Sequence, residues 1–175
     1  GYIQTATTIT TSSNRFSINV PSLQNLYFSV NCPLFNDNNA RAVIAVSFAN
    51  TYNALCFAFS SSIAKIQKIT SLNNGSITDL WTGSASADSD GNRIIHVRIN
   101  TTAKTLDMYI NGELIVETFS YSSISGAGVA QVLTFGKIDS SIGSAVKFNN
   151  FIISDSSFPP TERVIDVTPT ITTTD

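Results

Sequence analysis

Apolar and polar side chains alternate along much of this chain, and such a period of two predicts β-strands that bury one face. The clearest case is residues 92–119, which hold three short strands and two turns. The apolar set of the first strand is Ile95, Val97 and Ile99. The second turn is Asn111-Gly112, a pair that suits a type I′ hairpin because both central residues need positive φ. The segment therefore predicts three consecutive antiparallel strands.

The first turn of this segment, residues 100–104, is short and polar. Closing it as a hairpin places Arg98 opposite Asp107 and His96 opposite Tyr109. Opposite charges across a ladder stabilise a sheet modestly, so the first pair fits an ordinary surface ion pair. The alternative is a polar patch that hydrogen-bonds a ligand. His96 is the single histidine and has no clustered metal ligands around it, so its expected role is structural or at the rim of a site.

Further strands are expected at spacings of roughly ten residues, as in a sandwich. Their alternating apolar residues are Phe16, Ile18 and Val20; Leu26, Phe28, Val30, Cys32 and Leu34; Ala42, Ile44, Val46 and Phe48; and Leu55, Phe57 and Phe59. Pro21 is expected to end the first of these strands, because proline cannot donate to a ladder. Residues 61–70 fit a strand or a short helical turn. The last strand carries small residues on its other face, Ala54, Cys56 and Ala58, where a covering segment or a ligand would approach closely.

A family resemblance rests on the TLDMYINGELI hairpin at 105–115 and the strand before it. These residues resemble the laminin-G-like and pentraxin-like members of the concanavalin A-like lectin/glucanase superfamily. The stretches VLTFGKI (132–138) and VKFNNFIISDSSFPPTERV (146–164) resemble the family's closing strands, except that Asn149-Asn150 stands where a glycine turn is frequent. The resemblance covers about residues 90–165.

The resemblance implies an all-β fold, a two-sheet antiparallel β-sandwich of the jelly-roll, concanavalin A-like type. We expect this domain to span residues 1–166, because a chain of this length suits one domain. Residues 167–175 are Thr-rich with one proline and no core pattern. They are expected to form a linker or tail toward neighbouring domains of a larger chain or assembly.

The composition argues against two classes of partner, nucleic acids and membranes. The net charge is near −2, with 10 Lys and Arg residues that are not clustered, which argues against nucleic-acid binding. No apolar run approaches the roughly 18–20 residues of a membrane helix, so no membrane insertion is expected. The uncharged surface, rich in Ser, Thr and Asn, fits an extracellular or virion-surface location.

Catalysis is not expected. Glycosidases of the superfamily use an E-x-D-x-x-E-like run, and none is present. Glu113 and Glu117 lie four residues apart on one strand, about 13 Å at roughly 3.3 Å per residue, whereas a retaining pair needs about 5–5.5 Å. A Ser-His-Asp site would need His96 with a placed serine, and no G-x-S-x-G motif occurs.

Two further questions concern a metal site at residues 88–92 and a disulfide between the two cysteines. Asp88, Asp90 and Asn92 resemble half of a calcium loop, but Asp-Gly-Asn is also what a plain turn favours. Calcium is therefore a candidate cofactor. Other oxygen donors lie on predicted loops: Asn36, Asp37, Asn38 and Asp139. Cys32 is expected to point into the core and Cys56 away from it, which disfavours a disulfide.

Aromatic residues suggest where a sugar would bind. Trp81 is the sole tryptophan and is expected at a strand end, as a core plug more readily than as a platform. Tyr52, in a predicted turn, and Tyr121, in a Ser- and Gly-rich loop, are the better candidates for exposed rings. The candidate ligand contacts are therefore Tyr52, Trp81, His96, Arg98, Asp107, Tyr109 and Tyr121.

These observations favour a non-catalytic recognition or adhesion module that binds cell-surface or extracellular glycans. Domains of the kind that this chain resembles are found in adhesins and in bacteriophage tail, fibre or decoration proteins. The alternative is a purely structural or protein-binding domain of a virion. A sugar-binding domain is expected to expose an aromatic ring beside polar side chains in a depression. A structural domain is expected to bury its aromatics.

Overall fold

A computed structural model describes residues 2–5, 16–23, 25–33, 41–49, 53–70, 75–138, 146–154 and 169–170. All of the regular structure within these ranges is β-strand. The strands are β1 Tyr2–Thr5, β2 Phe16–Leu23, β3 Asn25–Asn31, β4 Arg41–Phe48, β5 Ala54–Phe59, β6 Ile63–Ile69, β7 Ile77–Ser84, β8 Ile94–Asn100, β9 Thr105–Ile110, β10 Glu113–Ser120, β11 Ala130–Ile138, β12 Val146–Ser154 and β13 Pro169–Thr170.

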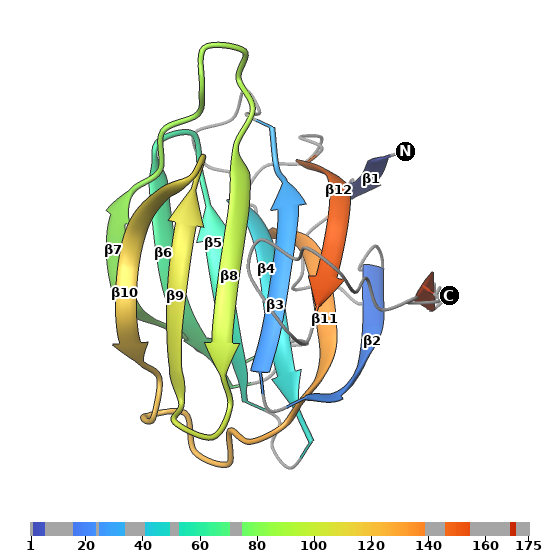
Figure 1. The fold of residues 1–175 in the computed structure, drawn as a ribbon, viewed down its shortest axis with the longest axis vertical. Coiled ribbons are helices and arrows are strands. Elements are labelled where there is room, and N and C mark those ends of the chain that lie inside the picture. The colour runs from blue at the N-terminus through green and yellow to red at the C-terminus, as the bar shows by residue number, and fades with distance from the viewer. Residues whose placement is uncertain are drawn as a thin grey trace.

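The strands form two stacked antiparallel sheets (Figure 1). The six-stranded sheet has the order β1-β12-β3-β8-β9-β10, and the seven-stranded sheet has the order β13-β2-β11-β4-β5-β6-β7. Strands β10 and β7 are the edges on the same side of the molecule (Figure 1). The predicted jelly-roll β-sandwich is confirmed.

The core lies between the facing sides of the two sheets. Leu26, Phe28 and Val30 of β3 are buried there, as the alternation predicts. Aromatic contacts join the layers edge to face. The ring centroids of Phe28 and Phe57 are 5.8 Å apart, and those of Phe135 and Phe148 are 5.4 Å apart. Such pairs stabilise a core beyond the area that they bury.

The predicted register of the central strands is confirmed. Arg98 lies opposite Asp107, and His96 lies opposite Tyr109. The turn between β9 and β10 has φ of 51° at Asn111 and 83° at Gly112, as a type I′ hairpin requires. Because one face of these strands is buried, a shift of one residue would expose the core set, and the register is strongly specified.

The structure decides two predictions about individual strands, one for residues 61–70 and one for Pro21. Residues 63–69 form strand β6, which settles the choice between strand and helical turn. The expectation that Pro21 ends its strand is wrong, since β2 continues to Leu23. The pairing of β2 with β11 is irregular between Asn19 and Leu23. The missing N–H of proline is tolerated at such an irregularity, so the strand passes through it.

The two cysteines lie on opposite sides of the seven-stranded sheet's plane. Cys32 belongs to the inter-sheet core. Cys56 belongs to a second buried cluster with Val43, Ala45, Ala54 and Ala58. Both thiols are free, and burial raises the pKa of each, although Arg93 partly opposes this at Cys32. The predicted opposite directions of the two side chains are confirmed.

Pro169 and Thr170 pair with Ile18 and Ser17 of β2. Part of the segment expected to be a tail therefore lies along the seven-stranded sheet. The division of the chain at residue 166 stays a prediction.

Candidate functional site

The outer face of the six-stranded sheet carries polar and aromatic side chains in cross-strand rows. The inward residues of β3, β8 and β9 belong to the core, so their alternate neighbours point outward. One row is Tyr27, Arg98 and Asp107, and the next is Asn25, Asn100 and Thr105. Residues far apart in the chain are thus brought side by side by strand pairing.

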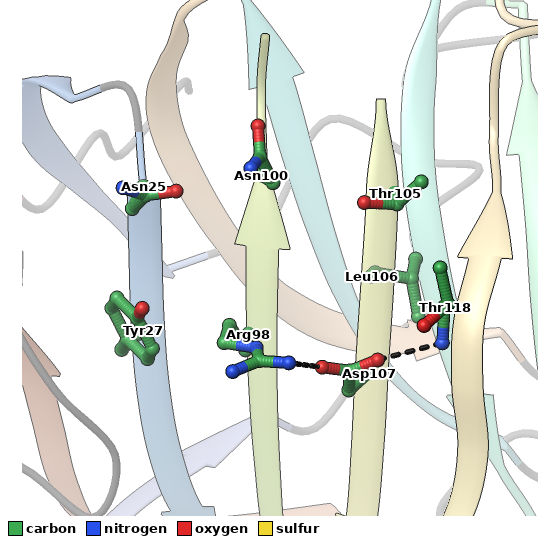
Figure 2. A pocket seen from close by; sticks show the side chains of 8 residues that line it. All are labelled: Asn25, Tyr27, Arg98, Asn100, Thr105, Leu106, Asp107 and Thr118. Carbon is green, nitrogen blue, oxygen red and sulfur yellow. Dashed lines mark hydrogen bonds and ion pairs between the residues drawn. The ribbon is translucent and has the colours of Figure 1, made fainter. Parts of the chain in front are cut away.

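These two rows line a depression with a volume of about 340 Å³. Figure 2 shows the side chains around it, with Tyr27 and the Arg98–Asp107 pair in line across three strands. The lining residues are Asn25, Tyr27, Arg98, Asn100, Thr105, Leu106, Asp107 and Thr118. The depression therefore offers a phenol ring, a guanidinium, two amides and two threonine hydroxyls.

An ion pair lines this depression. The Arg98 guanidinium donates to Asp107 Oδ2 (Figure 2). The two side chains differ sharply in exposure, with 51% of Arg98 and 6% of Asp107 accessible. Partial burial lowers the pKa of Arg98, but the hydrogen bond and the charge of Asp107 outweigh it, and the net pKa is raised. The guanidinium is therefore a fixed positive charge at the surface.

Asp107 also holds the edge strand in place. Its Oδ1 accepts a hydrogen bond of 2.6 Å from the backbone N–H of Thr118. The pairing of β10 with β9 is irregular between Val116 and Phe119, and Thr118 has a positive φ of 48°. A bulge leaves a residue outside the ladder, and here the carboxylate replaces the missing ladder acceptor.

His96 and Tyr109 form the next row along the same face, beside Ser29. All three are outside the depression's lining. Partial burial lowers the pKa of His96 below 6.5, so the neutral imidazole predominates at neutral pH. The structure places this pair one cross-strand row from Arg98 and Asp107, and their contact with a ligand stays a prediction.

The expectation that Tyr121 is an exposed ring is wrong. Its side chain is fully buried and stacks on Phe48 with centroids 5.9 Å apart. Its hydroxyl donates to the Asn100 carbonyl at 3.1 Å, and burial raises the pKa of Tyr121 to about 12. Ile124 and Ala127 of the same loop are also in the core, because the loop folds over the end of the sandwich instead of projecting from it.

Trp81 is partly buried and packs against the core from edge strand β7. An added Cβ at Gly83 would lie 2.3 Å from its ring, so the indole covers that glycine. Trp81 is not part of the depression. Tyr52 lies outside the described residues, as do Asn36, Asp37, Asn38 and Asp139.

The segment 88–92 forms a turn. Asp88 Oδ1 accepts the backbone N–H of Asp90 at 3.0 Å and that of Asn92 at 2.8 Å. Asn92 Oδ1 accepts from Asn31 Nδ2 at 3.2 Å. These contacts account for the Asp-Gly-Asn sequence as a turn signal, and binding of calcium by Asp88, Asp90 and Asn92 stays a prediction.

Tyr27 lines the depression but was not among the predicted site residues. It lies between Leu26 and Phe28 in a strand whose alternation was recognised, so its outward direction could have been inferred. Asn25, Asn100, Thr105 and Thr118 were not predicted either. The β8–β9 and β9–β10 hairpins bring Thr105 and Thr118 near Arg98. Tyr27 and Asn25 join them through the pairing of β3 with β8, two strands separated by more than sixty residues in the chain.

The depression contains one carboxylate, that of Asp107, which is already bound by Arg98 and Thr118. A glycosidase needs two carboxyl groups flanking the bond, so this depression has no such pair. Within the described ranges, no three His, Cys, Asp or Glu residues cluster as a metal site would require. The same ranges contain no helix of the length and apolar character needed to cross a membrane.

Comparisons with known proteins support the fold. No protein-family model matches the sequence, and no curated protein matches it. Among solved structures, the CBM2 module of the evolved Dit of Lactobacillus casei BL23 phage J-1 superposes with a TM-score of 0.54 at 13% identity, over 85% of this chain and 74% of that one. Sheep galectin-11 superposes with a TM-score of 0.51 at 10% identity, over 81% and 98%.

An enzyme shares the architecture as well. The xylan beta-1,4-xylosidase of Bacillus halodurans C-125 gives a TM-score of 0.59 at 11% identity, over 87% of this chain and 32% of that one. At these identities the likeness establishes a shared β-sandwich fold. Because both binding proteins and an enzyme carry this fold, function has to be argued from the site.

Proposed function

We propose that this chain is a non-catalytic glycan-binding module and that its site is the depression around Tyr27, Arg98 and Asp107. The observation that carries the proposal is the side-by-side placement of an aromatic ring, a guanidinium, amides and hydroxyls in one depression. Sugars present apolar C–H faces and many hydroxyls, and such a mixture of groups satisfies both.

The arrangement is also rigid. Its residues stand on paired strands instead of loops, and Asp107 fixes Arg98 on one side and the β10 bulge on the other. A site held in place before binding loses less conformational entropy when the ligand arrives. The depression is therefore suited to recognition of a ligand with a defined shape.

The wider assignment follows from this proposal. A laminin-G-like recognition or adhesion domain of an extracellular or virion protein would present such a face to cell-surface glycans. The phage Dit CBM2 module and the galectin fit that context. Calcium, if it binds at Asp88, Asp90 and Asn92, would act away from the depression, since none of these residues lines it.

A glycan array tests the proposal, with calcium and again with a chelator. We expect a defined group of glycans to bind the wild-type domain, and Tyr27→Ala to weaken that binding at least tenfold, because truncating an aromatic residue at the centre of a binding site costs roughly 2 kcal/mol or more and about 1.4 kcal/mol is tenfold. Ile94→Ala is the control, since Ile94 is an exposed residue at the other end of β8. Silence of a folded wild-type domain on the array would refute the proposal.

The array also tests the alternative, a structural or protein-binding domain. One observation favours that reading: β7 is a sheet edge with largely exposed residues, and Ile77 on it is 41% exposed. An unpaired edge can add a strand from another chain. If no glycan binds, this edge becomes the better candidate for the functional surface. If glycans bind but Tyr27→Ala has no effect, the glycan site lies elsewhere on the domain.

A further inference from the structure

We infer that the ligand of the Tyr27–Arg98–Asp107 depression is an anionic glycan, whose carboxylate or sulfate group sits on Arg98. This inference rests on the proposed function and deepens it. It follows from how the two charges of the site are distributed between the surface and the interior, and from the number of hydrogen-bonding groups that each charge has in use.

Asp107, the acidic member of the ion pair, is buried and not available to a ligand. Asp107 is 6% exposed. Its Oδ2 accepts from Arg98 and its Oδ1 accepts from the Thr118 N–H. A carboxylate with both oxygens engaged and almost no accessible surface cannot receive sugar hydroxyls. Asp107 is therefore a positioning residue, which orients the guanidinium and stabilises the bulge of β10.

The basic member faces the ligand. Arg98 is 51% exposed, and a guanidinium has five N–H donors. Among the residues that the structure describes, its hydrogen-bond partner is Asp107 alone, through Nη2. Figure 2 shows the other terminal nitrogen of Arg98 on the side of Tyr27, so the guanidinium has donors left for a ligand. The net charge of the pair is zero, but the charge that reaches the surface is positive.

Nothing else in the lining offsets this positive charge. Besides Arg98 and Asp107, the lining consists of uncharged residues. A planar guanidinium matches a carboxylate or sulfate through two parallel hydrogen bonds, which are stronger than bonds between neutral groups. The neighbouring row of Asn25, Asn100 and Thr105 supplies neutral amides and a hydroxyl. The depression thus has one place for an anion beside several for sugar hydroxyls.

The first test uses the wild-type protein and matched sugars that differ in the anionic group alone. The pairs are sialyllactose with its neutral methyl ester, trigalacturonate with galactotriose, and sulfated lactose with lactose, measured by titration calorimetry. We expect at least one anionic member to bind about tenfold or more tightly than its neutral partner, and its affinity to fall as sodium chloride is raised. The carboxylated and sulfated pairs show which anion is preferred.

The second test removes the charges without leaving a buried carboxylate unpaired. The double variant Arg98→Gln/Asp107→Asn keeps a polar pair across the same two strands. We expect it to lose the preference for the anionic sugar. The matched control is Lys65→Gln/Asp79→Asn, which neutralises the cross-strand ion pair of β6 and β7 on the other sheet and is expected to keep that preference. Thermal unfolding of each variant verifies that it is folded.

The outcomes separate this inference from the proposed function. Equal affinity for neutral and anionic sugars, with binding still lost in Tyr27→Ala, would overturn the inference and leave the glycan-binding function standing. An anionic preference that survives in Arg98→Gln/Asp107→Asn would also overturn it, because the anion would then bind elsewhere. Absence of binding to every sugar would overturn both. If the double variant does not fold, the wild-type sugar pairs and their salt dependence still decide.

Discussion

Arg93 is a charged residue that is buried beside the apolar core. Its side chain is fully buried, its Nη1 donates to the Ser60 carbonyl, and its guanidinium lies 5.4 Å from the centroid of the Phe59 ring. Arg93 precedes a strand of the six-stranded sheet, whereas Phe59 ends a strand of the other sheet and Ser60 follows it. We expect Arg93→Ala to lower the free energy of unfolding by about 2–5 kcal/mol, through the cavity and the unsatisfied carbonyl.

Urea unfolding with linear extrapolation measures this effect. Arg93→Met separates packing from charge, because it keeps most of the volume and removes the desolvated guanidinium. We expect it to cost less than half of what Arg93→Ala costs. Lys68→Ala, a half-buried cation on β6, is the control and is expected to stay within about 0.5 kcal/mol of wild type. Equal losses for Met and Ala would mean that the hydrogen bond, and not packing, gives Arg93 its value.

Single residues were predictable where the strand period decides their direction. Arg93 shares the parity of Ile95 and Val97, which are buried in the same core, so the alternation itself points it inward. The inward direction was not predicted, because a charged side chain is normally expected at the surface. Tyr121 shows the opposite limit: it stands in a loop without periodicity, so its burial against Phe48 depends on where the chain returns in space.

At the scale of an element, the β9–β10 hairpin depends on Asn111. This residue has a φ of 51°, its Oδ1 accepts the Ile94 N–H at 2.8 Å, and its Nδ2 donates to Ser86 and Asn92 carbonyls at 3.4 Å each. We expect Asn111→Ala to destabilise the protein by about 1–3 kcal/mol, from backbone strain and lost hydrogen bonds together.

Two further variants separate the contribution of backbone strain from that of the lost hydrogen bonds. Asn111→Gly removes the hydrogen bonds but accepts positive φ, so it is expected to cost less than Asn111→Ala. Gly112→Ala adds strain alone, since φ is 83° and nothing lies within 4 Å of the new Cβ; a loss of about 1 kcal/mol is expected. Thermal unfolding at matched pH measures all three. If Asn111→Gly were as damaging as Asn111→Ala, backbone strain would have no part in the effect.

The hairpins were predictable because their information is local. A polar loop and Asn111-Gly112, set between alternating strands, determine both the turn type and the pairing of Arg98 with Asp107. The candidate site needed more than that. Tyr27 joins Arg98 through pairing between β3 and β8, and the intervening strands β4 to β7 belong to the other sheet. No short-range pattern carries that crossover.

At the scale of the whole molecule, each of the two buried clusters contains one cysteine, whose reactivity can show when that cluster opens. Cys32 lies in the core between the sheets, and Cys56 lies in the separate cluster on the outer side of the seven-stranded sheet. Burial raises the pKa of both thiols, so little of the reactive thiolate is present in the folded state. We therefore expect a reducing agent to leave the melting temperature unchanged, and a thiol reagent to modify the native protein at the rate of unfolding.

Variants with one thiol each extend this test to the cooperativity of the sandwich. Cys56→Ala reports on Cys32, and Cys32→Ala reports on Cys56. Equal modification rates, after correction for any change in stability, are expected if both layers open in one transition. A much faster reaction at Cys56 would show that the outer cluster opens while the core stays closed. A melting temperature that falls with reductant would contradict the separation of the two thiols, because a bond between them requires Cβ atoms about 3.5–4.5 Å apart.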